Sequence, residues 1–263
     1  MARVLAISSQ VVYGPVGLNC IVPALQAQGH EVLAIPTILL SNHPGHGKPE
    51  GRATAPSELA LMIAALEKLN AFEDLDAVIT GYFAGPEQIE IVAELIARLK
   101  CKIVLIDPVL GDHGKLYVSQ FVAEAIRDKL VSLATILTPN AFELSWLTGL
   151  PIGNSDAAVL AARSLDVAEV IATSVVTSPD ELSTIRITVG HLETITTQME
   201  AKVPNGTGDF LSGLYLASLL SATPQSAFAD AMHHLQQAIA QSKGTSVLHV
   251  AQSLSLDNRN TSC

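Results

Sequence analysis

Short apolar segments alternate with helix-patterned segments along most of this chain. Strands are expected at residues 3–8, 32–40, 77–80, 102–106, 135–137 and 170–173. Helical patterns separate them, including residues 16–28 and segments that begin at Pro86, Asn140 and Ser155. Strands that are apolar on both faces are typical of a parallel sheet covered by helices. The pattern therefore predicts an α/β fold with a central, mostly parallel sheet flanked by helices.

The rhythm changes after Ser178. Residues 185–189 and 194–197 are rich in β-branched side chains and are joined through Gly190 and His191, which favours a small antiparallel hairpin at the sheet edge. No repeat, charged linker or low-complexity stretch interrupts the chain. Residues 1–263 are therefore predicted to form a single domain, with a frayed tail from about residue 253.

Composition excludes several classes of protein. With 263 residues and 49% hydrophobic content, the chain can bury a substantial core. Its net charge of −10 leaves no basic surface for nucleic acid or acidic lipid. Cys20, Cys101 and Cys263 fit neither a disulfide framework nor a zinc site, and no apolar run is long enough to span a membrane. We expect a reduced, cytoplasmic protein that binds neither nucleic acid nor membrane.

The tetrapeptide Gly206-Thr207-Gly208-Asp209 opens a long apolar helical segment. Glycines at a helix start leave backbone N–H groups accessible, and the helix dipole adds partial positive charge, so the turn is suited to an anion. A carboxylate beside an anion site is useful when it takes a proton from a hydroxyl that attacks a phosphoryl group. The alternative is a glycine-rich turn with Asp209 in the first helical turn, which is favourable helix chemistry by itself.

Polar residues follow each expected strand. They read Ser8-Ser9, Ser41-Asn42-His43, Gly81-Tyr82, Asp107-Pro108, Thr138-Pro139-Asn140 and Thr173-Ser174. In open α/β sheets, ligands bind beyond the carboxyl ends of the strands. The set therefore favours a catalytic crevice at that end of the sheet.

Two groups of these residues could organise a metal. Asp107 and Asp112 could hold Mg²⁺ directly or through water, or could be ordinary turn formers. Asn140 and Glu143 lie one turn apart at a helix start, so they could be an N-cap with its capping-box glutamate, or could help to order a metal. Both readings of the second pair can hold together.

Two loops carry further signals. Residues 41–51 are too rich in glycine and proline for regular structure, which is typical of a lid or recognition loop. His43 and His46 lack a third ligand nearby, so a metal site there is disfavoured. Residues 9–19 form a predicted strand-to-helix turn without the GxGxxG pattern, which disfavours a dinucleotide site.

Taken in order, these motifs resemble the pyridoxal kinases of the ribokinase-like superfamily. The resemblance runs from about residue 3 to about residue 220 and includes SQVVYG at 9–14 with Gly17, DPVLGD at 107–112 and TPN at 138–140 with Glu143. The tetrapeptide at 206–209 marks the superfamily, whereas the motifs at 9–14, 41–43 and 80–82 are closer to the vitamin B6 branch. The resemblance implies a three-layer sandwich and ATP-dependent phosphorylation of pyridoxal, with pyridoxine and pyridoxamine as further substrates.

The resemblance also implies roles for individual residues. Asp209 would deprotonate the 5′-hydroxyl, and an anion hole would be formed by Gly206, Thr207 and Gly208. The substrate ring would be bound by Ser9, Val16, His43 and Tyr82. Contacts to ATP would come from Asp112, Tyr117, Thr138, Asn140, Thr173 and Ser174, with Thr207. Mg²⁺ would be organised by Asp107 and Glu143, a monovalent cation such as K⁺ could assist, and the family is typically a homodimer.

Two departures from the family concern the ring pocket. The family usually has Gly-Asn where this chain has Gly17-Leu18-Asn19, and animal members have a hydroxyl residue where this chain has Pro44. Both put fine substrate preference in question and leave the phosphoryl-transfer motifs intact. The competing functions are a hydroxymethylpyrimidine or sugar kinase of the same superfamily, and a non-catalytic B6-binding module. Retention of Asp209 and Asp107 argues against the module.

Overall fold

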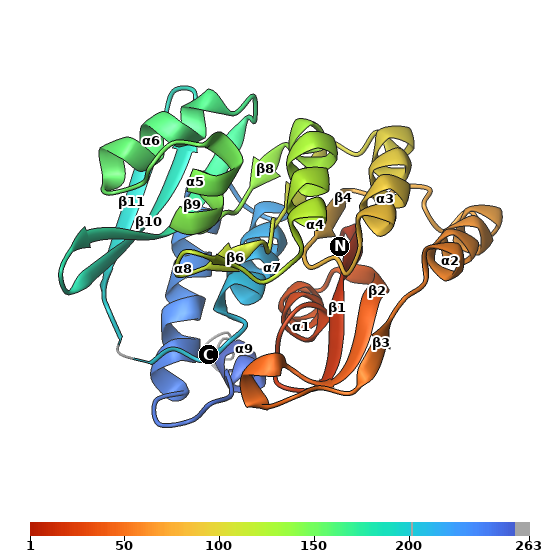
Figure 1. The fold of residues 1–263 in the computed structure, drawn as a ribbon, viewed down its shortest axis with the longest axis horizontal. Coiled ribbons are helices and arrows are strands. Elements are labelled where there is room, and N and C mark those ends of the chain that lie inside the picture. Colours follow the sequence, from red (N-terminus) through yellow and green to blue (C-terminus); the bar gives the residue numbers. More distant parts are fainter. Residues whose placement is uncertain (201, 256–263) are drawn as a thin grey trace. The chain divides into compact units, whose positions relative to one another are not determined.

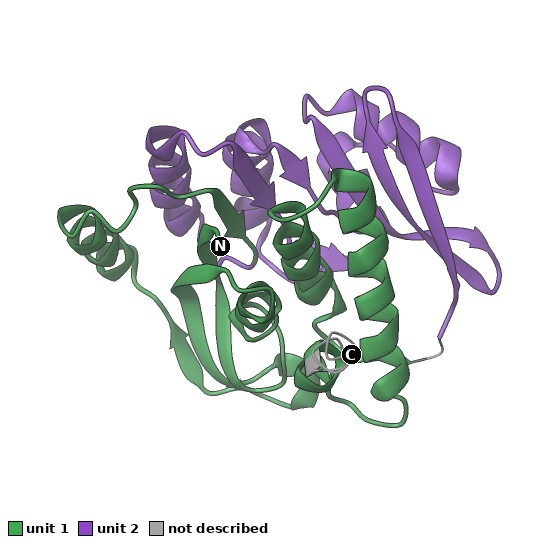
Figure 2. Cartoon of the chain, turned by 180° about the vertical axis from the view of Figure 1, so that it is seen from behind, with its two compact units in different colours: residues 1–81, 202–263 green, residues 82–201 purple. Residues whose placement is uncertain are grey.

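The computed structural model of the protein describes residues 1–200 and 202–255. It contains two compact units, one made of Met1–Gly81 with Lys202–Cys263 and the other of Tyr82–Ala201 (Figure 2). Figure 1 labels the helices and strands, and Figure 2 shows that each unit has its own strands and its own helices. The single domain expected from the sequence stays a prediction.

The first unit is built on strands in the order β4 (Ala77–Thr80), β1 (Arg3–Tyr13), β2 (Glu31–Asn42) and β3 (Gly51–Ala53). β1 is parallel to both β2 and β4, and β3 is antiparallel. Its helices are α1 (Leu18–Ala27), α2 (Pro56–Lys68), α7 (Thr207–Leu219), α8 (Pro224–Gln241) and α9 (Val250–Ser255). α1 packs on β1 and on α7, and α7 packs on α8. The stretch Val4 to Ile7 of β1 is fully buried, as expected of a central parallel strand.

The second unit is built on strands in the order β5 (Ile103–Ile106), β8 (Ile136–Leu137), β9 (Glu169–Ser178), β10 (Glu181–Thr188) and β11 (Leu192–Gln198). The first two pairs are parallel, and β9, β10 and β11 pair antiparallel. The helices are α3 (Pro86–Leu99), α4 (Gln120–Ala125), α5 (Ala141–Thr148) and α6 (Ser155–Ser164). A π-helical turn, Ile126–Leu130, and a 3-10 turn, Val131–Leu133, follow α4. A separate hairpin joins β6 (Gly111–Asp112) to β7 (Lys115–Leu116).

A buried ion pair connects β9 and β10 of the second unit. The Arg186 guanidinium donates to both carboxylate oxygens of Glu169, at 3.0 and 2.9 Å, and its side chain is 4% exposed. Burial of one member without the other would be costly, so the pair specifies this register. The α/β class, the mostly parallel sheet flanked by helices and the antiparallel edge hairpin are all confirmed.

Four local predictions are wrong. β1 continues to Tyr13 and β9 to Ser178, because pairing with β2 and β10 overrides the polar residues in them. The expected irregular loop at 41–51 includes the end of β2, a 3-10 turn at Pro44–His46 and the start of β3. The expected frayed tail begins instead as α9, in which Ser253 is fully buried, and residues 256–263 lie outside the described residues. No helix in the described part of the chain is long and apolar enough to cross a membrane.

Candidate active site

Ser9 lies at an irregularity in β1. The pairing of β1 with β2 shifts register between Ser8 and Gln10, as at a β-bulge, which re-aims the side chain at the bulge. Just beyond it, the Asn19 side chain donates to the carbonyl of Val11 at 2.6 Å and accepts a hydrogen bond from Gln10. Asn19 therefore holds the distorted strand from the first turn of α1, and Ser9 itself is buried.

The turn after β1 fits tightly against Ser9. Gly17 has φ 57, and a Cβ at this position would lie 2.3 Å from both the carbonyl oxygen and the Oγ of Ser9. A side chain at position 17 would therefore displace Ser9. The neighbouring departure from the family, Leu18, is 2% exposed and belongs to the core, and Val16 is also buried.

The turn before α7 has the same close fit. Gly206 is left-handed with φ 96, and a Cβ there would lie 1.9 Å from the carbonyl oxygen of Pro15. That carbonyl accepts from the Cys20 thiol at 2.9 Å, which fixes the turn between Gly14 and Gly17 against the helix start. The N-cap residue, Gly206, has no side chain, so within the described residues α7 begins without the side-chain cap that would occupy a first-turn N–H. Residues Gly206 to Gly208 therefore have the geometry of an anion site.

Asp209 is held by a hydrogen bond from Gly17, in the turn that follows β1. The backbone N–H of Gly17 donates to its carboxylate, which lowers the pKa, but desolvation by the surrounding protein is the larger effect and raises the pKa from the ordinary 3.8 to about 6. The side chain keeps some contact with solvent. At neutral pH the group is therefore an ionised carboxylate that is readily protonated, as a general base requires.

The 3-10 turn at Pro44–His46, which follows β2, packs near the start of α7. His43 caps the 3-10 turn by accepting from Gly45 N–H at 3.1 Å, and burial followed by the charge of His46 lowers its pKa. The His46 ring lies 5.0 Å from that of Tyr13, and a Cβ at Gly45 would lie 2.6 Å from the Asn205 amide. The turn at 44–46 thus packs beside the residue that precedes the tetrapeptide at 206–209.

In the second unit, Asp107 and Thr138 follow the paired strands β5 and β8. The backbone N–H of Thr138 donates to the carbonyl of Ile106 at 3.1 Å, and both side chains are 5% exposed. Two polar residues are thus buried together at the carboxyl ends of neighbouring strands, as predicted.

Asn140 and Glu143 form the predicted capping box of α5. The Asn140 side chain accepts from the Glu143 N–H at 2.9 Å, and the Glu143 carboxylate accepts from the Asn140 N–H at 2.9 Å. Glu143 also accepts from the N–H groups of Leu110 at 2.8 Å and Gly111 at 3.4 Å. Its pKa is raised to about 7, because desolvation outweighs these hydrogen bonds.

Asp112 and Tyr117 are carried by the β6–β7 hairpin. The Tyr117 N–H donates to the carbonyl of Leu110 at 2.8 Å, while its side chain is 65% exposed. Asp112 is partly exposed and accepts from the His113 N–H at 2.7 Å. The sequence did not predict this hairpin, because its strands are only two residues each.

Thr173 and Ser174 do not end a strand, contrary to the expectation. They lie inside β9, where its pairing with β10 shifts register. Thr173 forms an isolated bridge with Asn140 and donates to the carbonyl of Pro139 at 2.9 Å. Ser174 has φ 56, which is uncommon for a residue other than glycine and typical of functional positions.

The predicted residues thus fall into two sets. The first unit contains the residues predicted to bind the acceptor or to act in catalysis, which are Ser9, Val16, His43 and Gly206 to Asp209. The second unit contains the residues predicted to bind ATP or the metal, which are Asp107, Asp112, Tyr117, Thr138, Asn140, Glu143, Thr173 and Ser174. Tyr82, the first residue of the second unit, is half-buried, and burial raises the pKa of its hydroxyl.

Sequence reasoning missed two supporting residues. Asn19 braces the bulge at Ser9, and Cys20 fixes the carbonyl that packs on Gly206. A signal for Asn19 was present, since it departs by one position from the family's Gly-Asn pair. For Cys20 the only sequence signal was its place in the first turn of an apolar helix.

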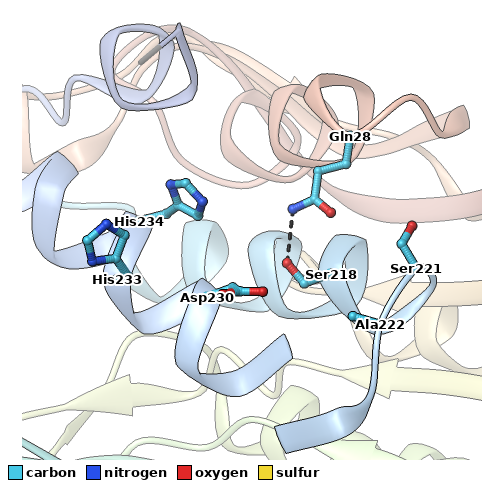
Figure 3. Close-up of a pocket in the computed structure, with 7 residues that line it drawn as sticks. All are labelled: Gln28, Ser218, Ser221, Ala222, Asp230, His233 and His234. Carbon is cyan, nitrogen blue, oxygen red and sulfur yellow. Dashed lines mark hydrogen bonds between the residues drawn. The ribbon is translucent and has the colours of Figure 1, made fainter. Parts of the chain in front are cut away.

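The first unit also has a polar hollow at the far end of α7, which the sequence did not indicate (Figure 3). It is lined by Gln28, Ser218, Ser221, Ala222, Asp230, His233 and His234. Gln28 donates to the Ser218 hydroxyl at 2.9 Å. The 13 residues of α7 separate this end from Asp209 by roughly 15–20 Å, so the hollow is distinct from the predicted anion site at Gly206 to Gly208.

Comparison with known proteins agrees with this geometry. Residues 48–253 match the phosphomethylpyrimidine kinase family. A pyridoxine/pyridoxal/pyridoxamine kinase of Bordetella avium is 38% identical, over 90% of this chain and 84% of that protein. The pyridoxal kinase PdxY of Corynebacterium diphtheriae is 33% identical, over 81% of this chain and 79% of that protein.

Solved structures extend the likeness to the fold. Pyridoxal kinase from Entamoeba histolytica superposes with a TM-score of 0.92 at 25% identity, over 97% of this chain and 95% of that one. The Leishmania donovani pyridoxal kinase in complex with ADP and pyridoxamine gives a TM-score of 0.90 at 28% identity, with the same coverage. The ribokinase-like fold expected from the resemblance is thus confirmed. The chain therefore belongs to the phosphomethylpyrimidine kinase family and, within it, to the pyridoxal kinases.

Proposed function

We propose that this pyridoxal kinase transfers the γ-phosphoryl group of ATP to the 5′-hydroxyl of pyridoxal with Asp209 as the general base. The observation that carries the proposal is the desolvated Asp209 carboxylate, held by the Gly17 N–H at the start of the uncapped helix α7. The names of the relatives support the substrate class, since one acts on pyridoxine, pyridoxal and pyridoxamine and another binds ADP with pyridoxamine.

In the proposed step, Asp209 takes the proton of the 5′-hydroxyl as its oxygen bonds to the γ-phosphorus. The bond from that phosphorus to the β–γ bridging oxygen breaks, and ADP leaves. Negative charge on the transferring group is stabilised by the N–H groups and dipole of the α7 start, from Gly206 to Gly208. A base with a pKa of about 6 is ionised at neutral pH and still accepts a proton readily.

The acceptor ring is assigned to Ser9, Val16, His43 and Tyr82. Ser9 is suited to a directed hydrogen bond, because the bulge and Gly17 fix its position. The lowered pKa of His43 keeps its imidazole neutral at physiological pH, so it can meet an aromatic ring without the cost of burying a charge. Pro44 carries no hydroxyl, so discrimination among the B6 vitamers falls to the other residues.

The nucleotide is assigned to Asp112, Tyr117, Thr138, Asn140, Thr173 and Ser174, together with Thr207. The backbone of Thr138 is fixed by its hydrogen bond to Ile106, and Asn140 and Thr173 are joined by a β-bridge, which suits these residues to fixed phosphate contacts. Tyr117 has most of its ring exposed, so it has surface available for the base or ribose.

The residues fit a metal that is held mainly by phosphate. Within the described residues, no group of three His, Cys, Asp or Glu side chains could hold a metal by itself. Mg²⁺ in kinases commonly takes one or two carboxylates plus substrate phosphates, a requirement that the buried Asp107 meets. When bound, the ion would neutralise charge on the β- and γ-phosphates. Asp107 and Glu143 stay the predicted metal residues, and K⁺ dependence, homodimer formation and a cytoplasmic location stay predictions from the resemblance.

A second acceptor deserves testing because the matching family is named for a pyrimidine kinase. The test is release of ADP from Mg·ATP with pyridoxal, hydroxymethylpyrimidine or ribose as acceptor. Pyridoxal should give the highest kcat/KM. Higher kcat/KM with hydroxymethylpyrimidine would reverse the substrate assignment and leave the phosphoryl-transfer chemistry in place, whereas no ADP release with any acceptor would contradict the proposed activity.

A further inference from the structure

The β6–β7 hairpin leaves the strand end at Asp107 through an unusual turn. Val109 has φ 27, a backbone conformation that is strained for a β-branched residue and persists only where the surroundings enforce it. The next two residues, Leu110 and Gly111, begin the hairpin that carries Asp112 and Tyr117. Whatever holds Leu110 and Gly111 therefore also enforces the turn.

The Glu143 carboxylate holds both residues. One of its oxygens accepts from the N–H groups of Leu110 and Gly111, at 2.8 and 3.4 Å, and the other accepts from the Asn140 N–H at 2.9 Å. The side chain is 5% exposed, so water has little access to replace these hydrogen bonds. Both oxygens of Glu143 are thus already engaged with backbone donors.

The rest of the first turn of α5 completes the grip on Gly111. The Asn140 side-chain amide donates to the carbonyl of Gly111 at 2.8 Å. A Cβ on Gly111 would lie 2.8 Å from the ring of Phe142 and 2.1 Å from the carbonyl oxygen of Lys115. The hairpin therefore rests on three residues of the helix start, Asn140, Phe142 and Glu143. It carries Asp112 in β6 and Tyr117 directly after β7.

We propose that Glu143 is a positioning residue: its carboxylate fixes the strained turn at 109–111 and so aims the β6–β7 hairpin at the nucleotide. It acts through Leu110 and Gly111, whether or not a metal is bound. This inference rests on the proposed function, because it takes Asp112 and Tyr117 to be nucleotide contacts. A metal-ligand role makes a different prediction, since substitution of Glu143 would then leave nucleotide binding unchanged when no metal is present.

Nucleotide binding without metal separates the two roles. The affinity for ADP is measured in excess EDTA for the parent, Glu143→Gln and Glu143→Ala. Glu143→Ala removes all three acceptor contacts and should weaken metal-free ADP binding by roughly tenfold, comparable with the loss of one charge-assisted hydrogen bond. Glu143→Gln keeps one oxygen for Leu110 and Gly111 and should fall between the parent and Glu143→Ala.

A second measurement reports on the hairpin itself and on folding. Amide exchange at Leu110, Gly111 and Tyr117 should be faster in Glu143→Ala without any ligand, while exchange in β1 stays as in the parent. The matched control is Glu58→Ala, because Glu58 is the corresponding capping-box residue of α2, accepts from the Ala55 N–H at 3.3 Å and otherwise pairs with the exposed Arg52 of β3. The control should leave ADP affinity and hairpin exchange unchanged.

Each outcome decides the matter. If Glu143→Ala binds ADP in EDTA as the parent does, with unchanged hairpin exchange and a loss only in Mg²⁺-dependent turnover, Glu143 is a metal ligand and the positioning role is wrong. If the parent neither binds ADP nor phosphorylates pyridoxal, the proposed function fails and this inference fails with it. Weakened metal-free binding together with faster hairpin exchange supports the positioning role.

Discussion

The N-termini of α5 and α7, which carry the key motifs, differ in how they are capped. α5 is capped twice, by Asn140 and by Glu143, and the same glutamate holds the turn before β6. α7 has no side-chain cap and begins with a left-handed Gly206 packed against the Pro15 carbonyl. A capped start gives up its N–H groups to the protein itself, whereas an uncapped start keeps them for a ligand.

The carboxylates at the two starts differ for the same reason. Burial raises the pKa of both, but Glu143 accepts from the N–H groups of Asn140, Leu110 and Gly111, whereas Asp209 accepts from the N–H of Gly17. Glu143 is therefore suited to holding structure and Asp209 to accepting a proton. The comparison teaches that similar sequence signals, an acidic residue in the first turn of a helix, support different roles depending on which N–H groups reach the carboxylate.

The largest expected effect comes from substituting Asp209, at the uncapped N-terminus of α7. Asp209→Asn should lower kcat by about 10²–10⁴-fold and leave ADP affinity unchanged, because the amide keeps the shape but cannot take the proton. Steady-state kinetics and ADP titration measure the two quantities. Asp230→Asn, on the exposed face of α8, is the control and should match the parent. Turnover of Asp209→Asn within about threefold of the parent would contradict the assignment of the base.

The glycines of the same turn should separate stability from activity. Gly206→Ala forces a side chain into a left-handed position 1.9 Å from the Pro15 carbonyl oxygen. It should lower the free energy of unfolding by at least about 2 kcal/mol. Gly208→Ala meets nothing within 4 Å and should leave that free energy unchanged or slightly higher. Its Cβ would still obstruct an anion, so its KM for ATP should rise.

Chemical denaturation and kinetics on both glycine variants measure these effects. The expected result is that Gly206→Ala fails in both assays and Gly208→Ala only in the kinetic one. Equal and full activity in Gly208→Ala would show that the α7 start does not contact the phosphates.

The pH dependence of stability tests how much the ionised Asp209 carboxylate destabilises the folded protein. Since the folded pKa of Asp209 lies above its ordinary value of 3.8, the stabilisation present at low pH is lost as the pH rises through about 6. At pH 8, Asp209→Asn should therefore be more stable than the parent by about 1–2 kcal/mol, discounted because the side chain is partly exposed. Below pH 4 the two should converge.

Thermal unfolding of both proteins from below pH 4 up to pH 8 gives the comparison. Glu143, with its pKa of about 7, also lowers the stability as the pH rises through about 7. Because Glu143 is present in both proteins, this contribution cancels in the difference in stability between the parent and Asp209→Asn. A parent that is more stable than Asp209→Asn at pH 8 would mean that the Gly17 hydrogen bond outweighs desolvation.

The smallest effects compare the two sets of binding residues. Tyr82→Ala should raise the KM for pyridoxal about 2–10-fold and spare that for ATP, whereas Tyr117→Ala should do the reverse, because aromatic contacts contribute about 0.5–1.5 kcal/mol beyond burial. The matched variants Tyr82→Phe and Tyr117→Phe keep the ring and should show smaller changes. Equal effects of Tyr82→Ala on both substrates would indicate a structural role for Tyr82.

Much of the fold could be predicted because local hydrophobic periodicity indicates its strands and helices. Residues Val4 to Ile7 of β1 and the strands β4 and β5 are largely continuous apolar runs, and α3 and α8 show one apolar face each. The β6–β7 hairpin and the extension of β1 to Tyr13 could not be predicted, because pairing with distant residues stabilises them. The candidate site residues were identified by their motifs, but their hydrogen-bond partners were not.

The sequence by itself determined the α/β class, the capping box of α5 and the uncapped glycine-rich start of α7, since each depends on residues within one or two turns. Only the tertiary structure decided that Gly17 reaches Asp209, that Pro15 packs on Gly206 and that Glu143 holds the turn at Val109. These contacts join segments far apart in the chain. Burial, which sets the pKa of both carboxylates, depends on every segment that packs around them and so cannot be read from any one motif.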